Sequence, residues 1–365
     1  MAQIRIQNVR KEFGTFTAVR SSSFTIEDGE FFMLLGPSGC GKTTTLRMMA
    51  GLELPTSGEI FIDGEEVGMK PASKRDIAFV FQMFALYPHM NVRKNISYPL
   101  VSQGMKREEV KTRVQEVARI LKIENILDRP VGGLSGGDRQ RVALGRAIVR
   151  RPKAFFMDEP LGALDAEFRE HMAEELRALH DRMGATTVYV THDQLEAMQM
   201  GDKIVVMNHG VVEQFGKPQQ IYDWPATKFV AQFIGSPPMN FLEFEGMIGI
   251  GGTSVELGEA RIEVPAAREG RAGKLTLGAR PEHVRFVSES AYRGRVTAVE
   301  YLGTTQIVTL RSSHGDLKAR VPSGQRVRED ELVGLEFDPR TLSVFDTETG
   351  KALRSDGNDG VLGHG

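Results

Sequence analysis

Residues 36–43 read Gly-Pro-Ser-Gly-Cys-Gly-Lys-Thr, which is the spacing of a loop that binds phosphate groups. Glycines let such a loop turn its backbone N–H groups toward an anion, and the N-terminus of a following helix adds partial positive charge. Lys42 is placed to reach the β- and γ-phosphates of a nucleotide, and the Thr43 hydroxyl is placed to hold Mg²⁺. A glycine-rich turn could match by chance, but an apolar run precedes the loop and a helical pattern follows it, which favours a phosphate site. The candidate nucleotide-binding residues are Gly36, Pro37, Ser38, Gly39, Cys40, Gly41, Lys42, Thr43 and Thr44.

Asp158 and Glu159 follow a second apolar run, residues 154–157. An aspartate at this position suits Mg²⁺, and hydrolysis needs a neighbouring carboxylate that polarises the attacking water. An acidic pair that merely starts a helix is the alternative. Beside a phosphate loop, the pair indicates hydrolysis, with Glu159 as the catalytic carboxylate.

Short apolar runs predict the strands that position these residues. Runs at residues 31–35, 77–81, 154–157 and 187–190 are apolar on both faces, which suits a parallel sheet whose ligands bind beyond the carboxyl ends of its strands. We therefore expect an α/β domain over residues 1–235. The polar residues and glycine that follow the runs, and that we expect at one edge, are Gly36, Gln82, Asp158 and His192.

A lone histidine such as His192 is more often a buried structural residue than a catalytic one. Residues 193–196, Asp-Gln-Leu-Glu, have the pattern of a helix capping box, which places His192 at a strand-to-helix corner. This position favours a role at the predicted edge.

Helical periodicity over residues 106–121 and 138–149 predicts a helical subdomain of about residues 83–152. Apolar residues at helical spacing before the capping residue Gly184 predict a further helix that packs on the core. The members of this stripe are Phe168, Met172, Leu176, Leu179 and Met183.

The chain changes character after residue 235. Glycines multiply, and short β-type runs follow, which predicts a small all-β domain over residues 236–353. Residues 354–365 are rich in glycine and aspartate, and we expect a disordered tail.

The composition is typical of globular proteins: 365 residues, 41% hydrophobic and 26% charged. The net charge is -2 and no dense basic run occurs, which argues against nucleic acid as a partner. We see no signal peptide and no apolar run near the ~20 residues of a membrane-spanning helix. If the protein acts at a membrane, another chain crosses it. One cysteine, Cys40, excludes an internal disulfide.

Residues 134–141, Leu-Ser-Gly-Gly-Asp-Arg-Gln-Arg, begin a predicted helix with Ser135 as N-cap and two glycines in its first turn. A well-capped helix without a special role would look the same. The run resembles the signature motif of the ATP-binding-cassette (ABC) family, which other phosphate-loop ATPases lack. The family's other motifs occur in order: Gln82 matches the Q-loop, residues 160–165 match the D-loop, and His192 matches the switch histidine.

The resemblance implies an ABC cassette, an α/β phosphate-loop NTPase with a helical subdomain, and ATP and Mg²⁺ as its cofactors. It assigns catalysis to Glu159, His192 and Gln82, metal binding to Thr43, Gln82 and Asp158, and further ATP contacts to Phe13, Ser135, Gly136, Gly137 and Asp165. Phe13 is the residue that would stack on adenine, although a lone phenylalanine is more often part of a core.

In this family, residues that match Ser135 and Gly137 complete the ATP site of a second cassette, so two ATP molecules are buried between two subunits. The second cassette is an identical chain or a related one. Two transmembrane permease subunits and, through them, a solute-binding protein are the other partners implied, at the cytoplasmic face of a bacterial inner membrane. The apolar residues 84–90 are interpreted as the permease-docking segment, with burial under the helical subdomain as the alternative.

Residues 233–241 and 277–284 resemble the junction and the OB-like, TOBE-type accessory domain of carbohydrate-importer ATPases, such as those for maltose or glycerol-3-phosphate. The resemblance implies import of a sugar, polyol or glycerol-phosphate-like solute. Importers of polyamine, sulfate, phosphonate or iron have similar β-rich tails and stay an alternative, as does a soluble ABC ATPase without a role in transport. Arg280 and Glu282 are interpreted as a structural ion pair.

One signature residue departs from the family pattern. The fifth position usually holds glutamine, and here it is Asp138. A carboxylate suits the N-terminus of a helix but would repel a triphosphate nearby.

Overall fold

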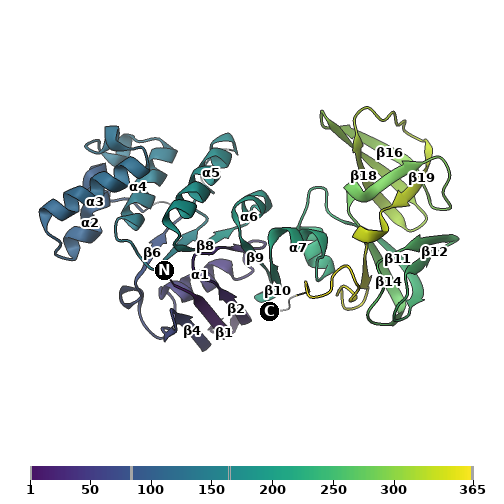
Figure 1. The fold of residues 1–365 in the computed structure, drawn as a ribbon, viewed down its shortest axis with the longest axis horizontal. Coiled ribbons are helices and arrows are strands. Elements are labelled where there is room, and N and C mark those ends of the chain that lie inside the picture. The colour runs from purple at the N-terminus through teal and green to yellow at the C-terminus, as the bar shows by residue number, and fades with distance from the viewer. Residues whose placement is uncertain (1, 83–84, 163, 165, 363–365) are drawn as a thin grey trace. The chain divides into compact units, whose positions relative to one another are not determined.

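The computed structural model describes residues 2–362, apart from residues 83–84, 163 and 165 (Figure 1). The chain divides into two compact units, of which the first ends at Val212 and the second begins at Glu213. Our predicted domain boundary near residue 235 lies beyond this division and stays a prediction.

A ten-stranded sheet forms the frame of the first unit, and the last of its strands along the chain begins at Val211 and continues past the division. Its strands are β1 (Ile4–Phe13), β2 (Phe16–Ile26), β3 (Phe31–Leu35), β4 (Ser57–Ile62), β5 (Glu65–Glu66), β6 (Ile77–Val80), β7 (Ala154–Asp158), β8 (Thr186–Thr191), β9 (Lys203–Asn208) and β10 (Val211–Gly216). The spatial order is β5-β4-β1-β2-β10-β9-β3-β8-β7-β6. The block from β9 to β6 is parallel, whereas β1 pairs antiparallel with β2 and β4.

The four predicted strands are confirmed as β3, β6, β7 and β8, which lie next to one another in the sheet. Every residue of β3, β7 and β8 is buried, as expected for strands covered on both faces. Leu35 pairs with Thr191, and Val80 pairs with Met157. The carboxyl ends of these strands therefore meet at one edge of the sheet.

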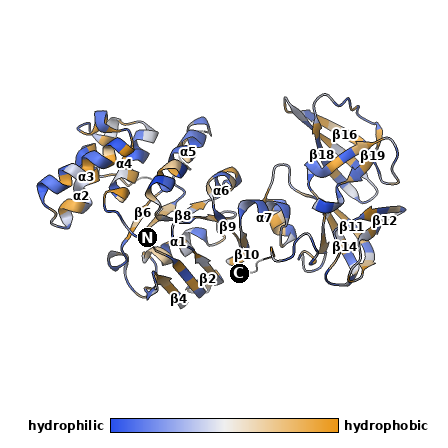
Figure 2. Cartoon of the chain, in the orientation of Figure 1, coloured by the Kyte–Doolittle hydropathy of each residue, from blue (hydrophilic) through white to orange (hydrophobic). Residues whose placement is uncertain are grey.

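The helices of the first unit are α1 (Lys42–Ala50), α2 (Val92–Ser102), α3 (Arg107–Ile120), α4 (Gly136–Ile148), α5 (Ala166–Met183) and α6 (Gln194–Met200). Helices α2, α3 and α4 pack together where we predicted the helical subdomain (Figure 1). On α5, Met172, Leu176 and Leu179 are buried as predicted, and Gly184 ends the helix with a φ of 60°. Figure 2 shows hydrophilic and hydrophobic colour on both α3 and α5, as amphipathic helices have.

The second unit contains two short helices followed by antiparallel strands, which confirms the predicted all-β domain. Its elements are α7 (Pro218–Asp223), α8 (Lys228–Phe233), β11 (Asn240–Ile248), β12 (Ser254–Leu257), β13 (Ala260–Glu263), β14 (Arg271–Ala279), β15 (Val284–Val287), β16 (Arg293–Tyr301), β17 (Thr305–Ser312), β18 (Gly315–Pro322), β19 (Leu332–Phe337) and β20 (Ser343–Asp346). The sheets are β11-β14-β20, β12-β13 and β15-β19-β16-β17-β18. One hydrophobic cluster joins them, with Leu242, Leu277 and Val296 fully buried.

Arg280 and Glu282 do not form the ion pair that we predicted; each binds Tyr222 instead. The Arg280 guanidinium donates to the Tyr222 carbonyl oxygen at 2.6 Å and lies 4.1 Å from the centre of its ring. The Tyr222 hydroxyl donates to Glu282 Oε1 at 2.5 Å, and burial raises the pKa of Tyr222 to about 12, so the phenol keeps its proton. The tyrosine thus separates the two charges.

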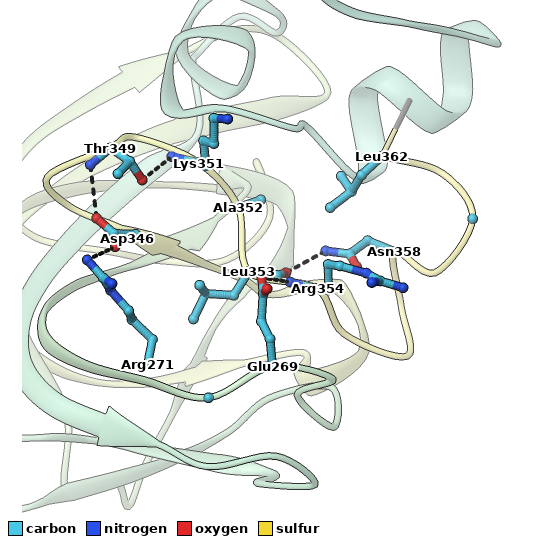
Figure 3. A pocket seen from close by; sticks show the side chains of 12 residues that line it. Glu269, Arg271, Asp346, Thr349, Lys351, Ala352, Leu353, Arg354, Asn358 and Leu362 are labelled. Carbon is cyan, nitrogen blue, oxygen red and sulfur yellow. Dashed lines mark hydrogen bonds and ion pairs between the residues drawn. The ribbon is translucent and has the colours of Figure 1, made fainter. Parts of the chain in front are cut away.

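The C-terminal segment differs from our expectation of disorder (Figure 3). The Arg354 N–H donates to Glu269 Oε1 at 2.7 Å, and Asn358 Nδ2 donates to the Leu353 carbonyl oxygen at 2.8 Å. Arg268 also forms ion pairs with two aspartates of the segment. These contacts attach the segment to the second unit as far as Asp359. The segment helps to line a cavity of about 640 Å³, whose lining includes none of the predicted site residues.

Across the described part of the chain, no helix combines the length and the apolar character that crossing a membrane requires.

Candidate functional site

The phosphate loop lies between β3 and α1, and two glycines allow its conformation. A Cβ atom on Gly36 would lie 2.3 Å from the Met207 carbonyl oxygen. Gly41 has a φ of 104° and is the N-cap of α1, and the first N–H groups of a helix lack partners within it. The buried Lys42 ammonium donates to the carbonyl oxygens of Gly36 and Pro37, at 2.8 and 2.9 Å. The loop therefore combines N–H donors with one positive charge.

Cys40 lies inside the loop and is 4% exposed. Burial raises the pKa of its thiol, and the Lys42 ammonium partly opposes this rise. Because the thiolate is the reactive form, the buried thiol should react more slowly than a free cysteine near neutral pH.

N-ethylmaleimide should inactivate nucleotide hydrolysis by modifying Cys40, and bound ATP should slow the inactivation. Because the pKa is raised, the inactivation rate should keep increasing with pH beyond the range in which free cysteine reaches its plateau. Cys40 is the single cysteine, so a time course of residual activity reports one site. Cys40→Ser should lose the sensitivity; a rate that ATP leaves unchanged would contradict a position of Cys40 in the nucleotide site.

Thr43 and Asp158 bring two oxygen groups together where α1 begins and β7 ends. The Thr43 hydroxyl donates to Asp158 Oδ1 at 2.9 Å. Burial raises the pKa of Asp158, while the Thr43 hydroxyl and the Arg47 guanidinium, 3.8 Å from Oδ2, oppose the rise. Hydroxyl and carboxylate oxygens are ligands that Mg²⁺ prefers, so this pair fits a magnesium ion.

Glu159 is the point where the predicted catalytic residues meet. Gln82 Nε2 donates to Glu159 Oε2 at 3.2 Å, and His192 Nδ1 lies 3.3 Å from Oε1. Glu159 has a φ of 43°, a left-handed conformation that costs a non-glycine residue about 1–3 kcal/mol. Its N–H donates to the Val190 carbonyl oxygen on β8 at 3.1 Å, which helps to hold this conformation.

The turn that carries His192 is capped as predicted, but the capping box is incomplete. Asp193 Oδ1 accepts hydrogen bonds from the N–H groups two and three residues later, at 2.8 and 3.3 Å. The buried Glu196 carboxylate accepts from the hydroxyls of Thr191 and Tyr189, at 2.7 and 3.0 Å. In a complete capping box the Glu196 carboxylate would accept a hydrogen bond from the Asp193 N–H. Here the hydroxyls of Thr191 and Tyr189 bind this carboxylate instead.

Ser135 is the N-cap of α4, as predicted, and its hydroxyl oxygen accepts from the Asp138 N–H at 3.1 Å. The Asp138 carboxylate lies 3.8 Å from the Arg141 guanidinium, which also binds Glu175 on α5 at 3.1 Å. The unusual negative charge in the signature run is therefore paired. Within the part of the chain that the structure describes, no hydrogen bond or ion pair joins residues 135–137 to the phosphate loop.

Two other predicted residues do not join the cluster around Glu159. Phe13 ends β1 with 48% of its surface exposed, and the Lys11 ammonium lies 4.7 Å from its ring centre. Asp165 lies outside the described residues.

Sequence reasoning missed Arg169, which lies on α5. Its guanidinium donates to the Leu164 carbonyl oxygen at 3.0 Å and lies 3.3 Å from Asp193 Oδ2. Arg169 thereby links Leu164, which follows Glu159 in the chain, to the turn that carries His192. An arginine on an amphipathic helix gives no local signal, because its partners are set by the fold.

Three family models match the chain. The model described as ABC transporter matches residues 19–162, the MalK OB fold domain matches residues 235–284, and the TOBE domain matches residues 277–345.

Similar proteins extend over almost the whole chain. The trehalose/maltose import ATP-binding protein MalK of Thermococcus litoralis is 48% identical over 371 residues, which are 97% of this chain and 100% of that protein. The sn-glycerol-3-phosphate import ATP-binding protein UgpC of Cereibacter sphaeroides is 46% identical over 357 residues, with 97% and 100% covered. Among solved structures, a dimeric post-hydrolysis state of the ATP-binding cassette MJ0796 bound to ADP and Pi has a TM-score of 0.53 and 32% identity, and the match covers 59% of this chain and 98% of that one.

Proposed function

Because this chain belongs to the ABC transporter family, we propose that it is the ATP-hydrolysing subunit of an importer for a sugar, polyol or glycerol-phosphate-like solute. The import proteins for trehalose/maltose and for sn-glycerol-3-phosphate support the solute class, since each matches through both units. The ATPase assignment depends on one observation: Gln82 and His192 both contact the Glu159 carboxylate. In this proposal residues 1–235 are the cassette and residues 236–353 are the accessory domain.

The phosphate loop binds the β- and γ-phosphates of ATP. The Lys42 ammonium is already held beside the loop backbone, and it exchanges carbonyl acceptors for charged phosphate oxygens, which form stronger hydrogen bonds. The N–H groups of residues 39–44 and the start of α1 supply the remaining donors. Phe13 is exposed at the end of β1, where its ring can stack on adenine.

Hydrolysis depends on the Glu159 carboxylate. Thr43, Asp158 and Gln82 would hold Mg²⁺, which when bound offsets negative charge on the β- and γ-phosphates. Glu159 accepts a proton from the attacking water at its carboxylate oxygen. Gln82 and His192 orient that carboxylate.

A second cassette completes the site. The N-terminus of α4 presents N–H groups, and Ser135 and Gly136 are exposed, as contact with the ATP of a partner requires. Gly137 belongs to the same first turn, and the pairing of Asp138 with Arg141 reduces its repulsion of the triphosphate. ATP binds the paired cassettes better than separate ones, so hydrolysis releases the pair.

The permease subunits dock beside the segment that follows Gln82. A groove of about 440 Å³ lies there, and Phe81, Tyr87, Tyr98 and Pro99 are among the residues that line it. Two such subunits would carry the solute and receive it from a solute-binding protein. The chain would then lie at the cytoplasmic face of a bacterial inner membrane.

Leu86→Asp should uncouple transport from ATP, because Leu86 belongs to this segment and a charge there would have to lose its water when a permease docks. Solute uptake by the reconstituted importer should fall at least about tenfold, since the loss of about 1.4 kcal/mol of docking energy suffices. Binding of ATP to the variant chain should persist. Leu332→Asp is the matched control, because Leu332 is an exposed leucine on β19 and belongs to the second unit. Normal uptake by Leu86→Asp would contradict docking at this segment.

The proposed function is tested with the purified chain and its co-purified membrane partners in proteoliposomes. We expect Mg²⁺-dependent ATP hydrolysis that a solute-binding protein loaded with maltose, trehalose or sn-glycerol-3-phosphate stimulates. Stimulation by spermidine or sulfate instead would select the alternative solute classes. If the chain hydrolyses ATP but no membrane protein co-purifies with it, the result would favour the alternative of a soluble ABC ATPase.

A further inference from the structure

Arg146 lies in the last turn of α4 and binds the segment that follows Gln82. Its guanidinium donates to the Ala85 carbonyl oxygen at 2.7 Å, and it lies 5.2 Å from the centre of the Tyr87 ring. We infer that Arg146 is a positioning residue for ATP hydrolysis, which keeps Gln82 against Glu159 by holding the backbone at Ala85.

The backbone at Ala85 needs such a contact. Its φ of 47° lies in the left-handed region, which an alanine adopts only where the surroundings enforce it. Burial lowers the pKa of the Arg146 guanidinium, as expected where water is partly excluded, and a charged donor in such surroundings forms a strong hydrogen bond. The bond from Arg146 therefore stabilises a conformation that the local sequence disfavours.

Ala85 lies close to Gln82 along the chain. Gln82 contacts Glu159 at 3.2 Å, and Ala85 follows three residues later. Three residues span at most about 11 Å, so the Ala85 backbone lies within that distance of Gln82. The other end of the segment is anchored separately, because the buried Asn95 side chain binds both the N–H and the carbonyl of Tyr87, at 2.8 and 3.1 Å.

Helix α4 connects the Arg146–Ala85 contact to the signature residue Ser135. The helix begins at Gly136, directly after Ser135, and carries Arg146 near its other end. A movement of α4 against a second cassette would thus be transmitted to Gln82 through one guanidinium. The same guanidinium lines the groove that we assign to the permease. The inference rests on the proposed function, since both the second cassette and the permease belong to it.

The test uses the purified full-length chain and steady-state ATP hydrolysis. Arg146→Met should lower kcat about tenfold, since small misplacements of a catalytic group have effects of this order or larger. KM for ATP should change less than about twofold, because the phosphate loop and the Thr43–Asp158 pair, which supply most of the contacts with Mg²⁺ and ATP, are not altered. Arg146→Lys keeps a donor for the Ala85 carbonyl and should recover most of kcat. Arg151→Met is the control: Arg151 follows α4, pairs with exposed Glu116 and is not part of the groove lining.

A double-mutant cycle with Gln82→Ala decides whether Arg146 acts through Gln82. If it does, adding Arg146→Met to Gln82→Ala should lower kcat by less than about twofold further, because residues that act as a unit are not additive. A full additional tenfold loss, or a rise in KM that matches the fall in kcat, would overturn the inference. If Arg146→Met does not fold, Arg146→Ala, which also lacks a donor and suits a helix, enters the same cycle. Absence of hydrolysis by the unmodified chain would refute the proposed function itself, whereas additivity in an active chain refutes only the role of Arg146.

Discussion

Glu159→Gln should lower kcat for ATP hydrolysis by about 100-fold or more, because loss of a general base commonly costs 10²–10⁴. Glutamine has nearly the shape of glutamate, so the contacts around it should persist, but its amide cannot take a proton from the attacking water. ATP binding should therefore survive the change. Phosphate release measures the turnover, and nucleotide binding by equilibrium dialysis measures the retained affinity.

The same variant should form an ATP-bound dimer, because ATP holds the two cassettes together and is not consumed. Size-exclusion chromatography with and without ATP would show this shift. Glu170→Gln is the matched control, since Glu170 is an exposed carboxylate on α5. Unchanged turnover in Glu159→Gln would remove Glu159 from the reaction and leave the role of the base to another residue.

Arg280→Met should destabilise the second unit by about 3 kcal/mol or more, because each buried acceptor left without a partner costs about 1–3 kcal/mol. Arg280 is 1% exposed, and its guanidinium donates to the carbonyl oxygens of Tyr222, Ala231 and Ile234. Methionine fills much of the volume but supplies no donor. Scanning calorimetry of the full chain should show a lower unfolding temperature for one transition only, since the two units have separate cores.

Arg285→Met is the matched control for this prediction, because Arg285 is exposed on β15 and its loss should change stability by less than about 0.5 kcal/mol. Arg280→Lys should rescue only in part, since a single ammonium nitrogen cannot reach all the carbonyls that Nε, Nη1 and Nη2 bind and cannot stack on a tyrosine ring as a planar guanidinium does. If Arg280→Met unfolds at the temperature of the unmodified chain, the buried carbonyls have found other donors and the anchoring role is wrong.

The sequence predicted those parts of the fold and the site that depend on local patterns. The strands β3, β6, β7 and β8 follow from short apolar runs, and the Ser135 cap follows from one residue type before a helical pattern. Because parallel strands end at a common edge, the approach of Gln82, Glu159 and His192 could be anticipated from where each run ended.

Contacts between distant segments were the part that the sequence could not supply. The bond from Arg146 to Ala85 joins residues 61 positions apart, and Arg280 reaches back across 58 positions to Tyr222. An arginine is compatible with many partners, and only the packed fold brings one of them within reach. The Arg280–Glu282 pair was wrong for this reason, since closeness in sequence says little about which buried carbonyl or hydroxyl will compete for a charge.

The left-handed backbone at Glu159 implies a conflict between thermal stability and catalytic turnover. Glycine would sit there without strain, and relief of a conformation that costs about 1–3 kcal/mol should more than offset the extra freedom of the unfolded chain. Screening random variants for thermal stability alone should therefore enrich Glu159→Gly. This variant should unfold at a higher temperature but no longer hydrolyse ATP. Any attempt to raise the thermal stability of this protein by mutagenesis would therefore need to keep Glu159 unchanged.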